Sequence, residues 1–166
     1  MPPHPAHHHG PGVSTTAPDG TTVNVNVMMP GYRPVGQLRI NRGLLKLILL
    51  GMVTCGIYPL ILFSSVSTDI NIIAQRYDGR KTMHYILMIL ISPFTCGILA
   101  IVWYHKISER IGNELMRRGI AYNFGAGTYW IWFWLGSLLF GIGPLVYMHK
   151  MLTAMNLLSA DYNVNG

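Results

Sequence analysis

Hydrophobic positions along this chain gather into three long runs that contain no charged residue. Lys, Arg, Asp and Glu are absent from residues 47–68, 82–104 and 119–148. Each run is about as long as the roughly 20 residues that a helix needs to cross a bilayer. None of them has the polar face that a helix of a soluble protein shows. The pattern predicts an all-α membrane protein of the multi-pass class.

The three runs follow one internal pattern, which is centred on a glycine. The sequence reads "TCGI" around Gly56 and again around Gly97, and "LFGI" around Gly141. Apolar residues lie on both sides of each glycine, and a polar junction and an amphipathic helix follow. Internal repeats in membrane proteins mark duplicated structural units. We therefore predict a membrane domain over residues 39–162 with three repeats, at about 41–80, 82–120 and 126–162.

Glycine and proline inside an apolar run predict a break in the helix. The predicted structural hinges of the three repeats are Gly56, Pro59, Gly97, Gly141 and Pro144. Such a break frees backbone groups that need partners inside a bilayer. The hydroxyls of Thr54 and Thr95, which stand two residues before their glycines, are candidates for that role.

Two topologies are open at these breaks. In the first, each repeat crosses the bilayer once as a kinked helix, with spans at about 43–63, 83–104 and 128–148. The distribution of Lys and Arg then places the N-terminus in the cytoplasm. In the second, each repeat is a re-entrant hairpin that returns to the side it left. The similar amphipathic helix after every repeat favours the hairpin, whereas unpaired backbone groups at the turn oppose it.

The helix predicted after each run carries one apolar stripe, which in the second repeat is Ile107, Ile111 and Leu115. Such a helix lies at the level of the lipid headgroups or packs on its neighbours above the membrane. The fold class predicted here includes the interfacial placement. Asp69 is a candidate partner for Arg110 of the next repeat. Residues predicted to anchor the spans at the bilayer interface are Trp103, Tyr104, His105, Lys106, Tyr147, His149 and Lys150.

Composition extends this picture to partners. The chain is 51% hydrophobic and 11% charged, with a formal net charge of +6. The positive charge suits anionic lipid headgroups, so we expect the lipid bilayer as partner, together with further copies of the chain in a homo-oligomer, and no nucleic acid.

Residues 1–38 are rich in Pro, His and Gly and are predicted to form a disordered tail. Within the tail, "TTVNVNVMM" has the alternation of one isolated strand. Its clustered histidines are weak candidates for metal ligands, namely His4, His7, His8 and His9. No other metal site and no cofactor is predicted.

The sequence contains no Walker loop, HExxH, GxSxG or CxxC motif. The hydrophobic runs also lack the ionisable residues that transporters and pumps usually keep inside the membrane. We therefore expect a non-enzymatic integral membrane protein that acts as a scaffold or presents its tail to a partner. The alternative is a small oligomeric transporter or channel, and a third hypothesis is a metal- or redox-handling protein that uses Cys55, Cys96 and the histidines.

Two stretches carry a family resemblance. "VTCGIYPLILFSSVSTDIN" from Val53 and "FTCGILAIVWYHKISERIGNEL" from Phe94 resemble domain of unknown function 4234, a family of small bacterial multi-pass membrane proteins. The resemblance covers about residues 41–118 and reaches the third repeat more weakly. It implies a location in the bacterial cytoplasmic membrane, and it implies no activity.

Overall fold

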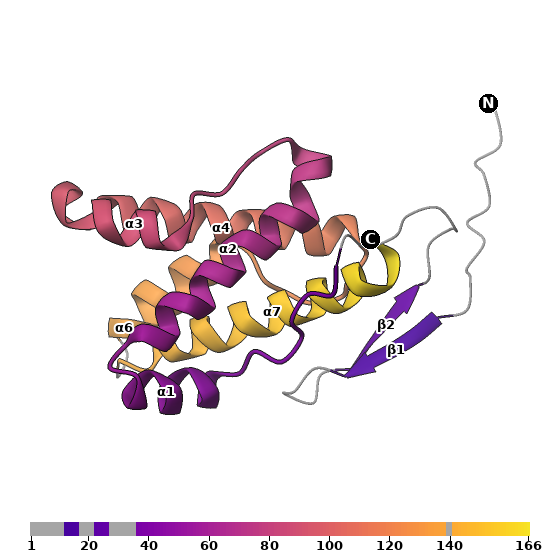
Figure 1. Cartoon of the computed structure of the whole chain (residues 1–166), viewed down its shortest axis with the longest axis horizontal. Helices are drawn as coiled ribbons and strands as arrows, with labels where there is room; N and C mark the ends of the chain where they lie inside the picture. Colours follow the sequence, from indigo (N-terminus) through magenta and orange to yellow (C-terminus); the bar gives the residue numbers. More distant parts are fainter. Residues whose placement is uncertain (1–11, 17–21, 27–35, 139–140) are drawn as a thin grey trace.

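The computed structural model describes residues 12–16, 22–26, 36–138 and 141–166 (Figure 1). From residue 36 on, the regular structure within these ranges is helical, which confirms the predicted all-α class. The elements in chain order are α1 (Leu44–Val53), α2 (Ile57–Asp78), α3 (Tyr85–Ile91), the 3-10 helix η1 (Ser92–Thr95), α4 (Ile98–Arg117), α5 (Ala126–Thr128), the π-helix η2 (Tyr129–Leu135), α6 (Gly136–Leu138) and α7 (Gly143–Asn165).

A small antiparallel hairpin of strands precedes the helices. β1 (Gly12–Thr16) pairs with β2 (Thr22–Asn26), with Val13 opposite Val25. The strand predicted in "TTVNVNVMM" is therefore not isolated, because β1 from the same tail pairs with it. The ten residues of β1 and β2 form regular structure, although residues 1–38 were predicted to be disordered. Strand pairing gives the backbone groups of β2 the hydrogen bonds that an isolated strand lacks. The four histidines of the tail lie outside the described residues.

Each hydrophobic run folds back on itself at its glycine. In the first run, a Cβ on Gly51 would lie 3.3 Å from Cγ of Pro59, so the residues before and after the break face each other. In the second, the indole nitrogen of Trp103 donates to the carbonyl of Met83 over 2.8 Å. We call these structures hairpin 1 (residues 44–65), hairpin 2 (85–106) and hairpin 3 (126–138 and 141–150).

The backbones of hairpin 3 approach most closely, because a Cβ on Gly136 would lie 2.7 Å from the Cα of Gly143. The single-crossing spans at about 43–63, 83–104 and 128–148 are thus each divided into two antiparallel arms. The positive φ angles at the glycines, described below, are the physical reason for the reversal.

The outgoing arms continue without interruption into a three-helix bundle, formed by residues 66–78 of α2, 107–117 of α4 and 151–165 of α7. The helices run parallel. Phe63 lies beside Tyr104, with ring centroids 6.4 Å apart, and further along both helices Arg110 donates to Asn71. On the other side, Ser108 bonds Tyr147 over 2.8 Å. Because the three helices run the same way from their glycines, the three hairpin tips lie at one end of the molecule, on the left of Figure 1.

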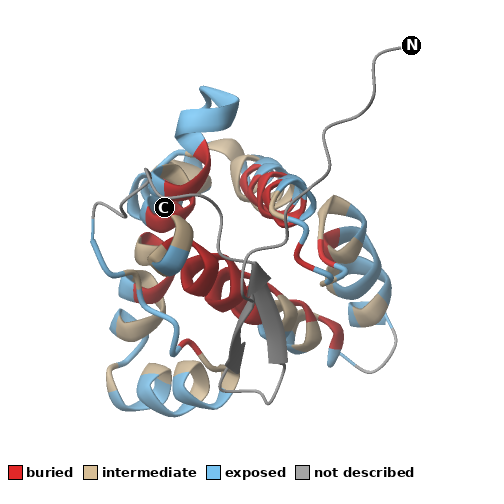
Figure 2. Cartoon of the chain, turned by 90° about the vertical axis from the view of Figure 1, so that its right-hand side faces the viewer, coloured by how far each residue is buried: buried red, intermediate tan, exposed pale blue. Residues whose placement is uncertain are grey.

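The amphipathic stripes form the centre of this bundle rather than lying on a membrane surface. Every member is at most 1% exposed: Val66, Ile70, Ala74, Ile107, Ile111, Leu115, Met151, Met155 and Leu158. Full burial of such an aliphatic side chain is worth roughly 1.5–3 kcal/mol. Neighbouring helices cover the apolar faces, so the stripes take the second of the two placements that the sequence left open, packing on other helices. α7 is the most enclosed helix, with every residue from 151 to 162 buried (Figure 2).

Asparagine side chains clamp the segments that lead into two of the hairpins. Asn71 of α2 accepts from the amide of Thr82 over 2.7 Å and donates to its carbonyl over 2.9 Å. Asn156 of α7 binds the backbone of Arg42 in the same way, over 3.1 and 2.7 Å. The aligned position in α4 is Gly112, where a Cβ would lie 2.5 Å from the carbonyl oxygen of Phe124. Each bundle helix thus holds the start of another hairpin.

Candidate membrane interface

The hairpin tips are built by residues with left-handed backbone conformations. Cys55 and Gly56 have φ angles of 50° and 90°, and Cys96 and Gly97 have φ angles of 49° and 81°. Gly141 has a φ of 68°. Glycine adopts positive φ without steric cost, and a residue in this region normally ends a helix. Two such residues in succession reverse the chain rather than kink it.

Threonine hydroxyls satisfy the backbone groups that the turns free. Thr54 donates to the carbonyl of Leu50 over 2.5 Å and accepts from the amide of Tyr58 over 2.9 Å. Thr95 repeats the arrangement, donating to Ser92 over 3.0 Å and accepting from Leu99 over 3.3 Å. Each hydroxyl therefore links the end of one helix to the start of the next. Unpaired backbone groups at the turns were the argument against a hairpin in lipid. The threonine hydroxyls give some of these groups hydrogen-bond partners.

Backbone bonds complete the turns. The amide of Gly56 donates to the carbonyl of Gly51 over 2.8 Å, and the amide of Gly97 donates to that of Ser92 over 3.0 Å. These are the long-range bonds of a helix that ends on a left-handed residue. The TCGI motif thus supplies a hydroxyl for the orphaned groups and two positions that take positive φ.

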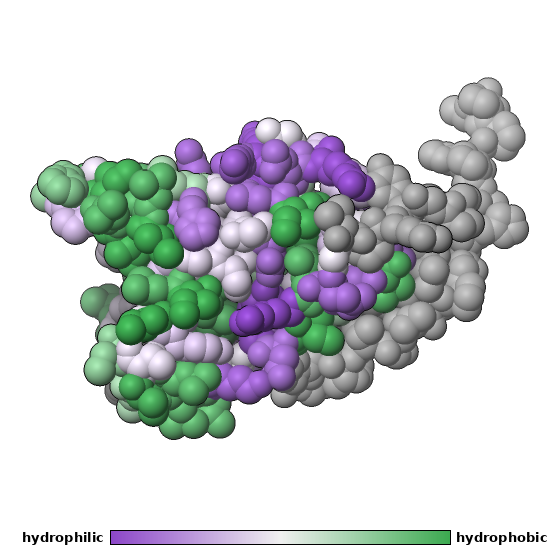
Figure 3. Space-filling model, viewed as in Figure 1, coloured by the Kyte–Doolittle hydropathy of each residue, from purple (hydrophilic) through white to green (hydrophobic). Residues whose placement is uncertain are grey.

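The tips expose large apolar side chains to the surroundings. Phe94, Leu138 and Val53 are 87%, 86% and 79% exposed. Figure 3 shows hydrophobic residues over the three lobes at the left end of the molecule, and hydrophilic residues over the middle. Monomeric soluble proteins rarely expose contiguous apolar patches beyond a few hundred Å². This end of the molecule is therefore the candidate interface with a membrane.

A lysine lies near the base of each hairpin. Lys46 precedes Thr54 by eight residues, and Lys106 and Lys150 each follow their glycine by nine residues. At about 1.5 Å per residue, the three ammonium-bearing residues lie roughly 12–14 Å from the tips along the helix axes. Basic residues at this height suit the headgroups of a lipid leaflet whose acyl region contains the tips.

The predicted interface anchors divide into two groups. Lys106 and His149 are exposed, and Tyr104, His105 and Lys150 are half-buried. Trp103 and Tyr147 are buried at 4% and 0% exposure, so the structure does not place them at a lipid surface. They point inward because they lie on the sides of α4 and α7 where the hairpins meet the bundle, and their rings pack on other aromatic rings. The exposed tryptophans are those of η2, namely Trp130, Trp132 and Trp134.

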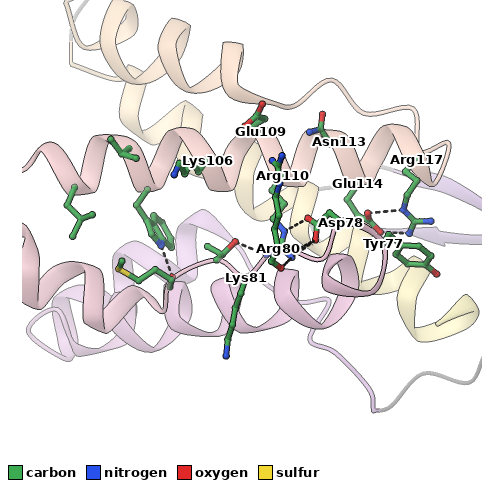
Figure 4. A pocket seen from close by; sticks show the side chains of 15 residues that line it. Tyr77, Asp78, Arg80, Lys81, Lys106, Glu109, Arg110, Asn113, Glu114 and Arg117 are labelled. Carbon is green, nitrogen blue, oxygen red and sulfur yellow. Dashed lines mark hydrogen bonds and ion pairs between the residues drawn. The ribbon is translucent and has the colours of Figure 1, made fainter.

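A groove of about 1010 Å³ runs between α4 and the loop that joins α2 to α3. Arg110 crosses it (Figure 4). Its guanidinium donates to both carboxylate oxygens of Asp78, over 2.6 and 3.0 Å, and to the Thr82 hydroxyl over 2.8 Å. The predicted pairing of Arg110 with Asp69 is therefore wrong. Asp69 pairs instead with Arg42, because the segment before α1 lies between α2 and α7.

Acidification is expected to loosen residues 79–84. Burial alone would raise the pKa of Asp78. The hydrogen bonds from the Arg110 side chain and the Arg80 amide, together with the positive charges of the two arginine side chains, outweigh burial, so the pKa of Asp78 lies below the ordinary 3.8. A lowered pKa in the folded state stabilises the loop fully above pH 3.8, and that stabilisation is lost as the pH falls through the lowered value. Amide hydrogen exchange of the loop, corrected for the intrinsic rate, should therefore accelerate. Asp78→Asn should exchange quickly at every pH; loop protection equal to wild type in that variant contradicts the assignment.

A second buried polar cluster surrounds Arg42, and the sequence did not predict it. Arg42 has a side chain that is 1% exposed, and it bonds Asp69, the Arg39 carbonyl and Ser159. A signal was available in the sequence, because Asn71 and Asn156 both stand fifteen residues after their glycines. Gly112 stands fifteen residues after Gly97 and interrupts that pattern, which concealed it. Among the described residues, no group of three His, Cys, Asp or Glu side chains is placed to hold a metal ion.

Comparison with known proteins bears on this interface. Within the described residues, α2 is the one helix with the length and mean hydropathy to cross a membrane, and its second half lies in the bundle. No curated protein and no solved structure matches the chain. Residues 42–113 match the family described as Domain of unknown function (DUF4234), and this segment contains both TCGI motifs. Over these residues the chain is similar to the DUF4234 family.

Proposed function

We propose that the chain is an integral membrane protein that enters and leaves the bilayer on one side. The three hairpins insert into one leaflet, and the bundle lies at its surface. The observation that carries the proposal is the gathering of three apolar tips at one end of a bundle of parallel helices. This arrangement favours one-sided insertion over three single crossings.

Length supports insertion into a single leaflet. α1 has 10 residues, and the apolar part of α4 runs from Ile98 to Tyr104 before Lys106. An arm of ten residues is about 15 Å long, which is half of the roughly 30 Å hydrocarbon core. A hairpin of this length fills one leaflet and does not reach the far side.

Charge supports the cytoplasmic side as the surface that carries the bundle. In the hairpin topology all the described Lys and Arg residues lie at the hairpin bases or in the bundle and its loops. Positive residues next to membrane segments are retained in the cytoplasm. The segment before α1 lies on the same side, since Asn163 of the bundle bonds the backbone of Leu38 over 2.7 and 2.9 Å.

The proposal includes an internal threefold repeat. It is supported by the positive φ at each glycine, by the nearly equal spacing of the buried stripes, and by the asparagine clamps at two of the three aligned positions. We further propose a non-enzymatic role, as a scaffold that holds the tail at the membrane surface. Most described carboxylates pair with arginines that tie segments together, as Asp69, Asp78, Glu114 and Asp161 do, which is typical of a structural network.

Cysteine labelling tests the topology. In a Cys55→Ser, Cys96→Ser background, single cysteines at Lys81, Met116 and Val164 follow hairpins 1, 2 and 3. We expect an impermeant maleimide to label all three in inverted membrane vesicles and none in intact cells. In the single-crossing topology, Lys81 and Met116 would react from opposite sides.

The tips provide the matched control. Single cysteines at Phe94 and Leu138 should resist the reagent from both sides, although these residues are more exposed in the isolated chain than Met116, at 73%. In denaturing detergent they should react as quickly as Met116. Labelling of the tips in sealed vesicles would sink the proposal, because it would place them in water.

A further inference from the structure

We propose that the groove between α4 and residues 77–83 binds one anionic phospholipid, with its phosphate at Lys106 and an acyl chain along Leu99 and Val102. This inference rests on the proposed insertion of hairpin 2, which brings the end of the groove that is lined by Leu99 and Val102 into the leaflet. The proposed insertion by itself involves no site for a single lipid molecule, and this inference adds one.

The groove has a polar end and an apolar end. On α4 it follows one helix face from Leu99 and Val102, past Lys106, to Asn113 and Arg117. The apolar residues lie in hairpin 2, and the polar residues lie in the bundle. A lipid has the same division, with chains in the leaflet and a phosphate at the surface. The volume of about 1010 Å³ lies at the upper end of the roughly 300–1,000 Å³ of ligand sites.

Charge complementarity favours an anion at the polar end. Two of the lining arginines have partners, since Arg110 pairs with Asp78 and Arg117 pairs with Glu114. The remaining charged residues that line the groove are three cations, Arg80, Lys81 and Lys106, and one carboxylate, Glu109. No hydrogen bond or ion pair joins these four side chains to another described side chain.

The cations come from both walls of the groove. Lys106 belongs to α4, and Arg80 and Lys81 belong to the facing loop (Figure 4). Lys81 extends away from α4 in this view, so Lys106 is the cation at the boundary between the apolar and polar parts. A lysine is a flexible point charge that suits a phosphate at a wet site. The neighbouring Thr82 hydroxyl is occupied by Arg110, which fixes the loop beside Lys106.

Native mass spectrometry of the full chain in neutral detergent tests the site. We expect the wild type to retain one palmitoyl-oleoyl phosphatidylglycerol and to retain phosphatidylcholine with the same chains much less. Lys106→Glu should raise the dissociation constant of phosphatidylglycerol at least about tenfold, because it replaces an attraction by a repulsion. The matched control is Lys150→Glu, which changes the same position of the third repeat outside the groove and should shift the constant by less than about twofold.

Three outcomes would overturn the site. One is an equal loss in Lys106→Glu and Lys150→Glu, which indicates surface adsorption. Another is equal retention of phosphatidylglycerol and phosphatidylcholine, which indicates that the site does not select an anionic headgroup. The third is displacement of phosphatidylglycerol by glycerol phosphate at the same concentration, which indicates that the apolar end of the groove binds no acyl chain. The measurement is made in detergent and does not depend on insertion. Loss of the lipid site with correct cysteine labelling therefore rejects this inference alone, and failed labelling rejects the proposed topology.

Discussion

Asp69→Ala is expected to lower the free energy of unfolding by about 3–5 kcal/mol, the usual cost of removing one partner from a buried ion pair. The side chains of Asp69 and Arg42 are 12% and 1% exposed. Burial raises the pKa of Asp69 and lowers that of Arg42, even though each charge favours the ionised form of the other. Desolvation therefore outweighs the attraction, and the variant leaves a guanidinium buried without a counter-ion.

The double variant Arg42→Met, Asp69→Leu separates this cause from a general loss of packing. Replacing both charges removes the unpaired cation, so we expect the double variant to be more stable than Asp69→Ala. Thermal unfolding in detergent, followed by far-ultraviolet circular dichroism, measures both. A double variant as unstable as the single one would show that the hydrogen bonds of Arg42 to Arg39 and Ser159, rather than charge balance, hold the segment before α1.

Gly143→Ala is the second substitution with a large expected effect. The new Cβ would lie 2.0 Å from the carbonyl oxygen of Trp132 and 2.5 Å from the Cα of Gly136. Both obstacles are backbone atoms that no rotamer change can move. We expect the arms of hairpin 3 to separate at a cost of about 3 kcal/mol, the upper end of ordinary overpacking.

Gly127→Ala is the control for that substitution. Gly127 lies in α5, and a Cβ there would meet no atom within 4 Å. In a helix this change is neutral or stabilises by up to about 1 kcal/mol. Thermal unfolding and tryptophan emission report on both variants, since η2 carries Trp130, Trp132 and Trp134. Equal stability of the two variants would mean that the backbones of hairpin 3 do not touch at Gly143.

Hydrophobic patterning predicted much of the fold. The spacing of Ile107, Ile111 and Leu115 placed a stripe on one side of a helix, and the structure has that stripe on α4 at 0–1% exposure. The pattern did not say what covers the stripe. An apolar face is equally compatible with lipid and with two neighbouring helices, and only the parallel packing of α2, α4 and α7 decides between them.

The direction of the chain after each glycine was the main point that could not be predicted. A glycine permits both a kink and a reversal, and the choice depends on its neighbour. Cys55 and Cys96 share the left-handed conformation, which is uncommon for a residue with a side chain. The partner of Asp69 was missed for a related reason. Arg42 and Arg110 are both available basic residues, and their distances from Asp69 follow only from the hairpin geometry.

The clamp of Asn156 on the backbone of Arg42 joins the last helix to the segment before α1. Repeats that stack in an open row leave two unfinished ends, which need capping units and allow the row to grow. Here the last helix takes hold of the segment before the first hairpin, so the assembly is a closed ring. A fourth unit would have to displace that segment, together with the ion pair of Arg42 and Asp69. The first and last parts of the helical domain are therefore joined to each other within a single chain.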